Sequence, residues 1–118
     1  MEQLTNKEEE IMQALWSLEK AFVKEIVAAL PDGNHYNTVS TIVRNLADKG
    51  FIAYTAFGKT HQYYPTVSKE EYTKRFMNLA MKQYFNNSYK SMVSFFAKEE
   101  KISAQELREI LEIIEKKQ

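Results

Sequence analysis

The sequence predicts a mainly α-helical fold with a small β component, and three observations support this. The 118 residues include only 3 Gly and 2 Pro, so few positions interrupt long helices. Apolar residues recur at helical spacing through most of the chain. Ser/Thr-x-x-Glu patterns, which cap helix N-termini, begin at Thr5, Ser68 and Ser103. This length fits one small domain with a helical appendage, and we expect the parts to be residues 1–67 and 68–118.

Three helices are predicted in the first part. Apolar residues at helical spacing predict the first helix over Asn6–Leu18. A shorter series predicts a second helix over Val23–Leu30, closed by the turn-forming residues 31–34. The third helix is expected to begin at Asn37, a favourable N-cap residue, and to end at Lys49-Gly50, where Gly takes the left-handed position.

A β-hairpin is predicted after the third helix. Residues 51–57 and 60–67 are rich in strand-forming residues, and Gly58-Lys59 between them suits a tight turn. Pro65 is expected to lie in an edge strand, where its missing N–H is tolerated. Three short helices followed by a hairpin is the order of a winged helix-turn-helix, in which the third helix enters the DNA major groove and the hairpin flanks it.

The C-terminal part carries more apolar surface than a small domain can cover. Ser68 begins a long helix to about Phe85, a second helix follows over about Tyr89–Lys98, and Ser103 caps the last. The surplus predicts a helical dimerisation region with a second copy of the chain as partner. A three-helix core within one chain is the alternative. The expected dimerisation residues are Phe76, Leu79, Phe95, Phe96, Leu107, Ile110, Leu111 and Ile114.

The charge distribution favours a nucleic-acid partner only locally. The chain has 16 basic and 16 acidic side chains. Residues 36–66 hold 3 basic and 1 acidic side chain, a net charge of +2, whereas the first helix is acidic and is expected to lie away from DNA. The absence of Cys and of any apolar stretch of membrane-spanning length leads us to expect a cytoplasmic protein that does not insert into membranes.

Five short motifs follow one another in a fixed order along nearly the whole chain. They are Leu4-Thr5-x-x-Glu8, Ile11-Met12-x-x-Leu15-Trp16, Thr38-Val39-x-Thr41-Ile42-Val43-x-x-Leu46, Lys49-Gly50-Phe51-Ile52 and Tyr63-Tyr64-Pro65. In this set the sequence resembles the penicillinase repressors of the BlaI/MecI type, a family that also includes the copper-responsive CopY repressors. The resemblance implies a homodimeric transcriptional repressor that binds an inverted-repeat operator on double-stranded DNA.

The third helix and the hairpin supply the expected DNA-binding residues. The polar residues of the third helix form a stripe on the side opposite its apolar stripe. The alternative interpretation is that this stripe is simply a solvent-exposed helix face. The resemblance assigns operator contact to the positions Thr38, Ser40, Thr41 and Arg44, and Asn37 and Lys59 complete the expected set. Relatives usually carry several Lys or Arg on the first hairpin strand. Residues 52–57 have none, so only Lys59 and His61 can meet phosphate there, and we expect a shallower salt dependence of binding.

The resemblance also implies a release mechanism. In antibiotic-responsive relatives a membrane sensor metalloprotease triggers cleavage in the dimerisation region, and the matching bond here is Phe95–Phe96. Relatives usually carry Asn before the cut, and the Phe pair is equally consistent with a core position. Because the chain has no Cys, it lacks the Cys-rich metal site of the copper-sensing branch.

The sequence predicts no enzyme, no cofactor and no metal site. No Ser-His-Asp pattern or nucleotide-binding loop is visible, and His35 and His61 are isolated. The acidic runs 8–10 and 99–100 are expected to be solvated. Two rival functions remain open: a winged helix that binds protein, and a single-strand RNA binder that stacks bases on Tyr54, Phe57, Tyr63 and Tyr64.

Overall fold

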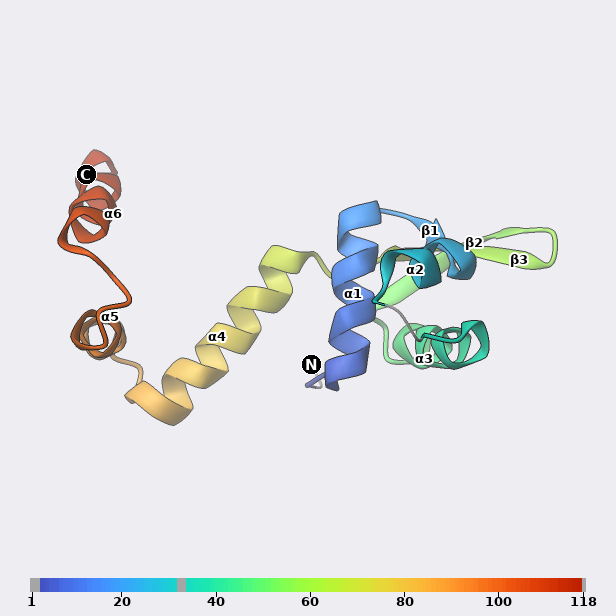
Figure 1. The fold of residues 1–118 in the computed structure, drawn as a ribbon, viewed down its shortest axis with the longest axis horizontal. Helices are drawn as coiled ribbons and strands as arrows, with labels where there is room; N and C mark the ends of the chain where they lie inside the picture. The colour runs from blue at the N-terminus through green and yellow to red at the C-terminus, as the bar shows by residue number, and fades with distance from the viewer. Residues whose placement is uncertain (1–2, 32–33, 118) are drawn as a thin grey trace. The chain divides into compact units, whose positions relative to one another are not determined.

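The computed structural model describes residues 3–31 and 34–117, and it divides the chain into two compact units (Figure 1). The first unit ends at Lys74 and the second begins at Arg75. This division falls inside helix α4 (Lys69–Phe85), whereas the sequence suggested a boundary after residue 67. The first turn of α4 packs into the N-terminal unit, which accounts for the later division.

The N-terminal unit has the predicted order of helices and hairpin. Its elements are α1 (Asn6–Leu18), β1 (Ala21–Phe22), α2 (Val23–Ala29), α3 (Tyr36–Asp48), β2 (Ile52–Phe57) and β3 (Thr60–Pro65). The predicted turn at Asp32-Gly33 lies outside the described residues. We refer to the β2–β3 hairpin, residues 52–65, as the wing.

The sheet contains a strand that the sequence did not predict. The three strands are antiparallel in the order β1-β3-β2, so β3 is central and the prediction that Pro65 lies in an edge strand is wrong. Pro65 is nevertheless tolerated because β1 pairs only with Gln62 and Tyr63, and Pro65 lies beyond that pairing. β1 has only two residues, too few to show the alternation by which strands are recognised.

Helix α3 begins one residue earlier than predicted. His35 is its N-cap, in extended backbone geometry and without a side-chain cap, so the prediction that Asn37 caps this helix is wrong. Its C-terminal end agrees with the prediction. Gly50 has φ +85, its N–H donates to the Ala47 carbonyl, and the Phe51 N–H donates to the Leu46 carbonyl. These two bonds form a Schellman motif, which needs the left-handed backbone that Gly adopts without strain.

The core lies between the three helices and the inner face of the sheet. Ile11 and Leu15 of α1, Ile26 of α2 and Val39 and Val43 of α3 are completely buried. Each comes from the apolar stripe that predicted its helix. Fully burying an aliphatic side chain of this size contributes about 1.5–3 kcal/mol, so these stripes set how the three helices pack.

Aromatic contacts attach the first turn of α4 to this core. The Tyr72 ring lies 5.6 Å from that of Trp16 and 6.2 Å from that of Phe51. The Trp16 indole N–H donates to the Val67 carbonyl at 2.8 Å, and the Tyr72 hydroxyl donates to Glu9 at 2.7 Å. Burial, followed by the interaction with Glu9, raises the pKa of Tyr72 to about 12, so its hydroxyl keeps the proton that it donates.

A partly buried ion pair joins the start of α1 to the end of α3. Glu8 is 5% exposed, and its carboxylate accepts hydrogen bonds from the Thr5 N–H at 2.9 Å and from the Lys49 ammonium at 2.8 Å. The first bond completes the predicted capping box at Thr5. The prediction that the acidic run 8–10 is solvated is therefore wrong for Glu8. The sequence could not reveal this, because the partner lies 41 positions away.

The C-terminal unit consists of α5 (Tyr89–Lys98), α6 (Ala104–Lys116) and the remainder of α4. The predicted capping box at Ser103 is present, and the Ser68 hydroxyl accepts a hydrogen bond from the Glu71 N–H at the start of α4. Among the described residues from 75 to 117, Met81 is the one buried side chain. In the described part of the chain, no helix combines the length and apolar character needed to cross a membrane.

The Glu8–Lys49 pair predicts an acid-sensitive stability. Burial alone raises the pKa of Glu8, but the hydrogen bonds from Lys49 and Thr5 outweigh it and lower the pKa below its ordinary value of 4.5. A lowered folded-state pKa contributes stability that is complete above pH 4.5 and is lost as the pH falls through the folded-state value. At pH 7 we expect Glu8→Gln to reduce the free energy of unfolding by about 1–3 kcal/mol.

Urea denaturation of the unsubstituted protein and of Glu8→Gln from pH 7 to pH 3 measures this loss of stability. The difference between their free energies of unfolding should shrink below pH 4.5. Glu10→Gln is the matched control, because Glu10 is exposed and its ion pair with Lys7 lies at the surface. Its effect should stay within about 0.5 kcal/mol. A Glu8→Gln deficit that is unchanged at pH 3 contradicts the role given to the ion pair.

Candidate DNA-binding surface

Helix α3 separates its apolar and polar residues onto opposite sides. Val39, Val43 and Leu46 are completely buried. The residues that the sequence singled out on the other side are exposed, except for the half-buried Ser40. The exposed ones are Asn37, Thr38, Thr41, Arg44 and Asn45. A helix held by one face in this way leaves the other face accessible, and in winged helices such a face can enter the DNA major groove.

Two hydrogen bonds order side chains along the exposed face. The Thr41 hydroxyl donates to the Asn37 carbonyl one turn earlier, at 3.0 Å. The Arg44 guanidinium donates to the same hydroxyl oxygen at 3.4 Å. Because the Thr41 proton is used within the helix, its methyl group is the part left to meet a ligand, and a methyl group suits contact with a thymine methyl.

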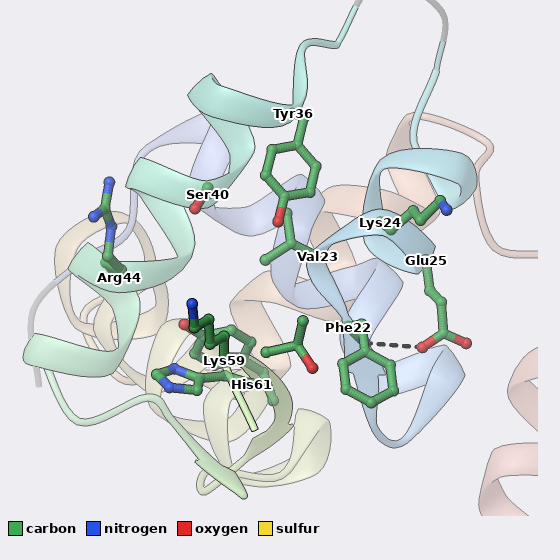
Figure 2. Close-up of a pocket in the computed structure, with 11 residues that line it drawn as sticks. Phe22, Val23, Lys24, Glu25, Tyr36, Ser40, Arg44, Lys59 and His61 are labelled. Carbon is green, nitrogen blue, oxygen red and sulfur yellow. Dashed lines mark hydrogen bonds between the residues drawn. The ribbon is translucent and has the colours of Figure 1, made fainter. Parts of the chain in front are cut away.

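A groove of about 540 Å³ runs between α3, the wing and the segment Phe22–Glu25 (Figure 2). We call it the α3–wing groove. Helix α3 contributes Tyr36, Ser40 and Arg44, which recur every fourth residue and therefore lie along one flank of the helix. The wing contributes Lys59 to His61, together with Tyr63.

The groove divides the predicted DNA-binding residues into two groups. It brings together Ser40, Arg44 and Lys59, which come from two separate elements. Asn37, Thr38 and Thr41 do not line it and lie on the neighbouring, outward side of α3. The sequence treated all six residues as one set.

Lys24 and Tyr36 also line the groove and were not among the residues predicted from the sequence. The spacing of Tyr36 from Ser40 and Arg44 was a usable signal, because every fourth position shares a helix flank. No comparable signal existed for Lys24, since the packing of α2 beside the wing depends on tertiary contacts. Among the described residues that line it, the groove thus carries three cationic side chains, Lys24, Arg44 and Lys59, and one carboxylate, that of Glu25.

Apart from Lys59, the wing presents mainly aromatic rings. Tyr54 and His61 stack with their ring centroids 3.9 Å apart and an interplanar angle of 5°, and Tyr63 meets both edge-on. Phe57 is 52% exposed, and its ring meets Phe22 edge-on at 5.8 Å. Burial, followed by the neighbouring Tyr54, raises the pKa of Tyr63, so its phenol stays protonated.

The C-terminal unit leaves its predicted interface residues uncovered. Seven of the eight are exposed, from 38% at Phe96 to 52% at Leu111, and Leu107 is half-buried. Phe95 and Phe96 lie inside helix α5, with their rings 5.3 Å apart, and Phe85 meets Phe95 at 5.8 Å. Within residues 3–31 and 34–117, no three His, Asp or Glu side chains are grouped closely enough to hold a metal ion.

Comparison with known proteins identifies the family. The family model described as penicillinase repressor matches residues 4–116. The chain belongs to the penicillinase repressor family. The Bacillus licheniformis penicillinase repressor is 23% identical over 115 residues, covering 96% of this chain and 90% of that protein. The methicillin resistance regulatory protein MecI of Staphylococcus aureus strain N315 is 28% identical over 121 residues, covering 98% and 95%.

Membership of the penicillinase repressor family confirms the predicted resemblance and the predicted class of protein. The family and these relatives are transcriptional repressors and not enzymes, as the sequence indicated. A solved structure of Bordetella bronchiseptica BpsR, studied for the regulation of its DNA binding by 6-hydroxynicotinic acid, matches 97% of this chain and 74% of its own. The TM-score is 0.50 at 16% identity, a likeness of fold alone.

Proposed function

We propose that this penicillinase repressor homologue acts in the cytoplasm as a homodimer that binds an inverted-repeat operator, with α3 of each subunit in the major groove. The observation that carries the proposal is the exposed polar face of α3 beside the cationic α3–wing groove. The major groove admits one α-helix and displays base edges to its side chains. Asn37, Thr38 and Thr41 are suited to those edges, and Ser40, Arg44 and Lys59 to the phosphates beside them.

The exposed apolar surface of the C-terminal unit supports the proposed homodimer. Apolar side chains recur along α6 at positions 107, 110, 111 and 114, which form one stripe. Leu107 is half-buried and the other three are exposed. With Met81 as the one buried side chain among described residues 75–117, this unit has little core of its own. A second copy that covers these stripes would bury them, and twofold pairing also matches the symmetry of an inverted repeat.

Release by a membrane sensor metalloprotease, which triggers cleavage at the Phe95–Phe96 bond, is the last part of the proposal. Cutting within the dimerisation region separates the subunits and weakens operator binding. The bond lies within helix α5, so α5 must unwind locally before a protease can act on it.

One prediction of this proposal concerns Arg44. We expect Arg44→Ala to weaken operator binding by about 1–3 kcal/mol, because the guanidinium holds either a phosphate or a guanine edge, while the dimer stays intact. Fluorescence anisotropy with the upstream DNA of the chain's own gene measures this. Lys20→Ala is the control, since it removes one exposed cation that does not line the groove. Equal affinities for Arg44→Ala and the unsubstituted protein favour the rival function, a winged helix that binds protein.

A second prediction concerns the dimer. We expect Leu111→Glu to convert the protein to a monomer at micromolar concentration, because two buried carboxylates destabilise the interface by several kcal/mol. Sedimentation equilibrium gives the mass. Glu112→Ala, on the far side of α6 from the stripe, should leave the dimer unchanged. An unsubstituted protein that is already monomeric at this concentration refutes the homodimer.

A third prediction concerns release. In cells that carry the neighbouring genes of this chain and receive inducer, we expect an N-terminal fragment ending at residue 95. Mass spectrometry of the recovered repressor identifies it. Phe95→Asn introduces the residue that relatives carry before the cut, and should accelerate the appearance of the fragment. Derepression with only intact chain present shows that release takes another route.

A further inference from the structure

The α3–wing groove lies where a DNA backbone must pass if α3 occupies a major groove. A helix about 10–12 Å across fills a groove about 12 Å wide, so each flank of the helix faces a sugar–phosphate strand. The flank of α3 that faces the wing carries Tyr36, Ser40 and Arg44. The sugar–phosphate strand of the DNA on this side is therefore enclosed between α3 and the wing.

The charge of the groove matches a phosphodiester strand. The chain as a whole has no net charge, yet of its described residues three cations and one carboxylate line this groove. That carboxylate, Glu25, accepts a hydrogen bond from the Phe22 N–H at 2.8 Å, at the edge of the groove (Figure 2). The α1 carboxylates Glu8 and Glu9 are bonded to Lys49 and Tyr72, neither of which lines the groove.

Tyr36 is placed to act with these cations. Its ring is 54% exposed, and Figure 2 shows its hydroxyl pointing into the groove, with Lys59 on the opposite wall. Lys24 and Arg44 lie at the two ends of the groove in the same view. A phenol and two ammonium groups on three different elements can each donate a hydrogen bond to phosphate oxygens.

We propose that the α3–wing groove is a phosphodiester-binding subsite in which Tyr36 and Lys24 contact the DNA backbone together with Lys59. This rests on the proposed operator binding and deepens it. Contact with bases is then left to the outward side of α3, where Asn37, Thr38 and Thr41 lie. Lys24 of α2 and Tyr36 of α3 also compensate for the cations that the first β-strand of the wing lacks, because they hold the DNA backbone instead.

The test compares operator with an unrelated duplex of equal length, both titrated with KCl. Backbone contacts carry no sequence information, so Tyr36→Phe should weaken binding to both duplexes by the same factor, about 10-fold for the two subunits. Lys24→Ala should reduce the slope of log K against log salt by about 0.9 for each subunit. Tyr64→Phe is the matched control, because Tyr64 is 41% exposed but does not line the groove.

Each outcome decides a different point. If Tyr36→Phe and Lys24→Ala bind like the unsubstituted protein while Arg44→Ala is impaired, the subsite is refuted and the operator-binding proposal stands. A Tyr36→Phe defect confined to the operator assigns Tyr36 to a base and also overturns the subsite. If the unsubstituted protein binds neither duplex at low salt, the proposed function itself fails.

Discussion

The orientation of α3 depends on how its apolar stripe is buried. Val39, Val43 and Leu46 are inaccessible to solvent, so α3 cannot rotate about its axis without exposing them. The pair between Glu8 and Lys49 adds a polar attachment where α3 ends. Since a helix has one rotation for a given buried stripe, the same constraint determines which residues face outward. The proposed DNA-binding surface is thus a consequence of the core.

Helix α3 presents two distinct polar surfaces. The outward side has short hydrogen-bonding side chains and the Thr41 methyl, whereas the flank toward the wing combines cations with a phenol. The wing closes the second surface with the rings of His61 and Tyr63, and Tyr54 stacks on His61. In the proposed complex the residues of the groove neutralise phosphates, because the first wing strand has no Lys or Arg. The C-terminal unit is the converse case, because most of the apolar side chains in its stripes are exposed.

Strong local patterns allowed much of the fold to be predicted. The capping box at Thr5 and the Gly50 helix end are set by residues close together in sequence, and both agree with the structure. Features that depend on distant partners were missed or misread. Strand β1 exists because it pairs with β3 some forty positions later, and Glu8 is buried because of Lys49. In the candidate site the exposed face of α3 was predictable, whereas the groove formed by three separate elements was not.

The most direct test of this account is a hydroxyl-radical footprint of the full chain on the DNA upstream of its gene. Two α3 helices held by one dimer should protect two stretches on the same face of the duplex, with centres one helical turn of about 10 base pairs apart or a multiple of it. Protection should extend along the backbone on the side that the wing covers. A single protected stretch, or uniform protection without a preferred position, would contradict the account.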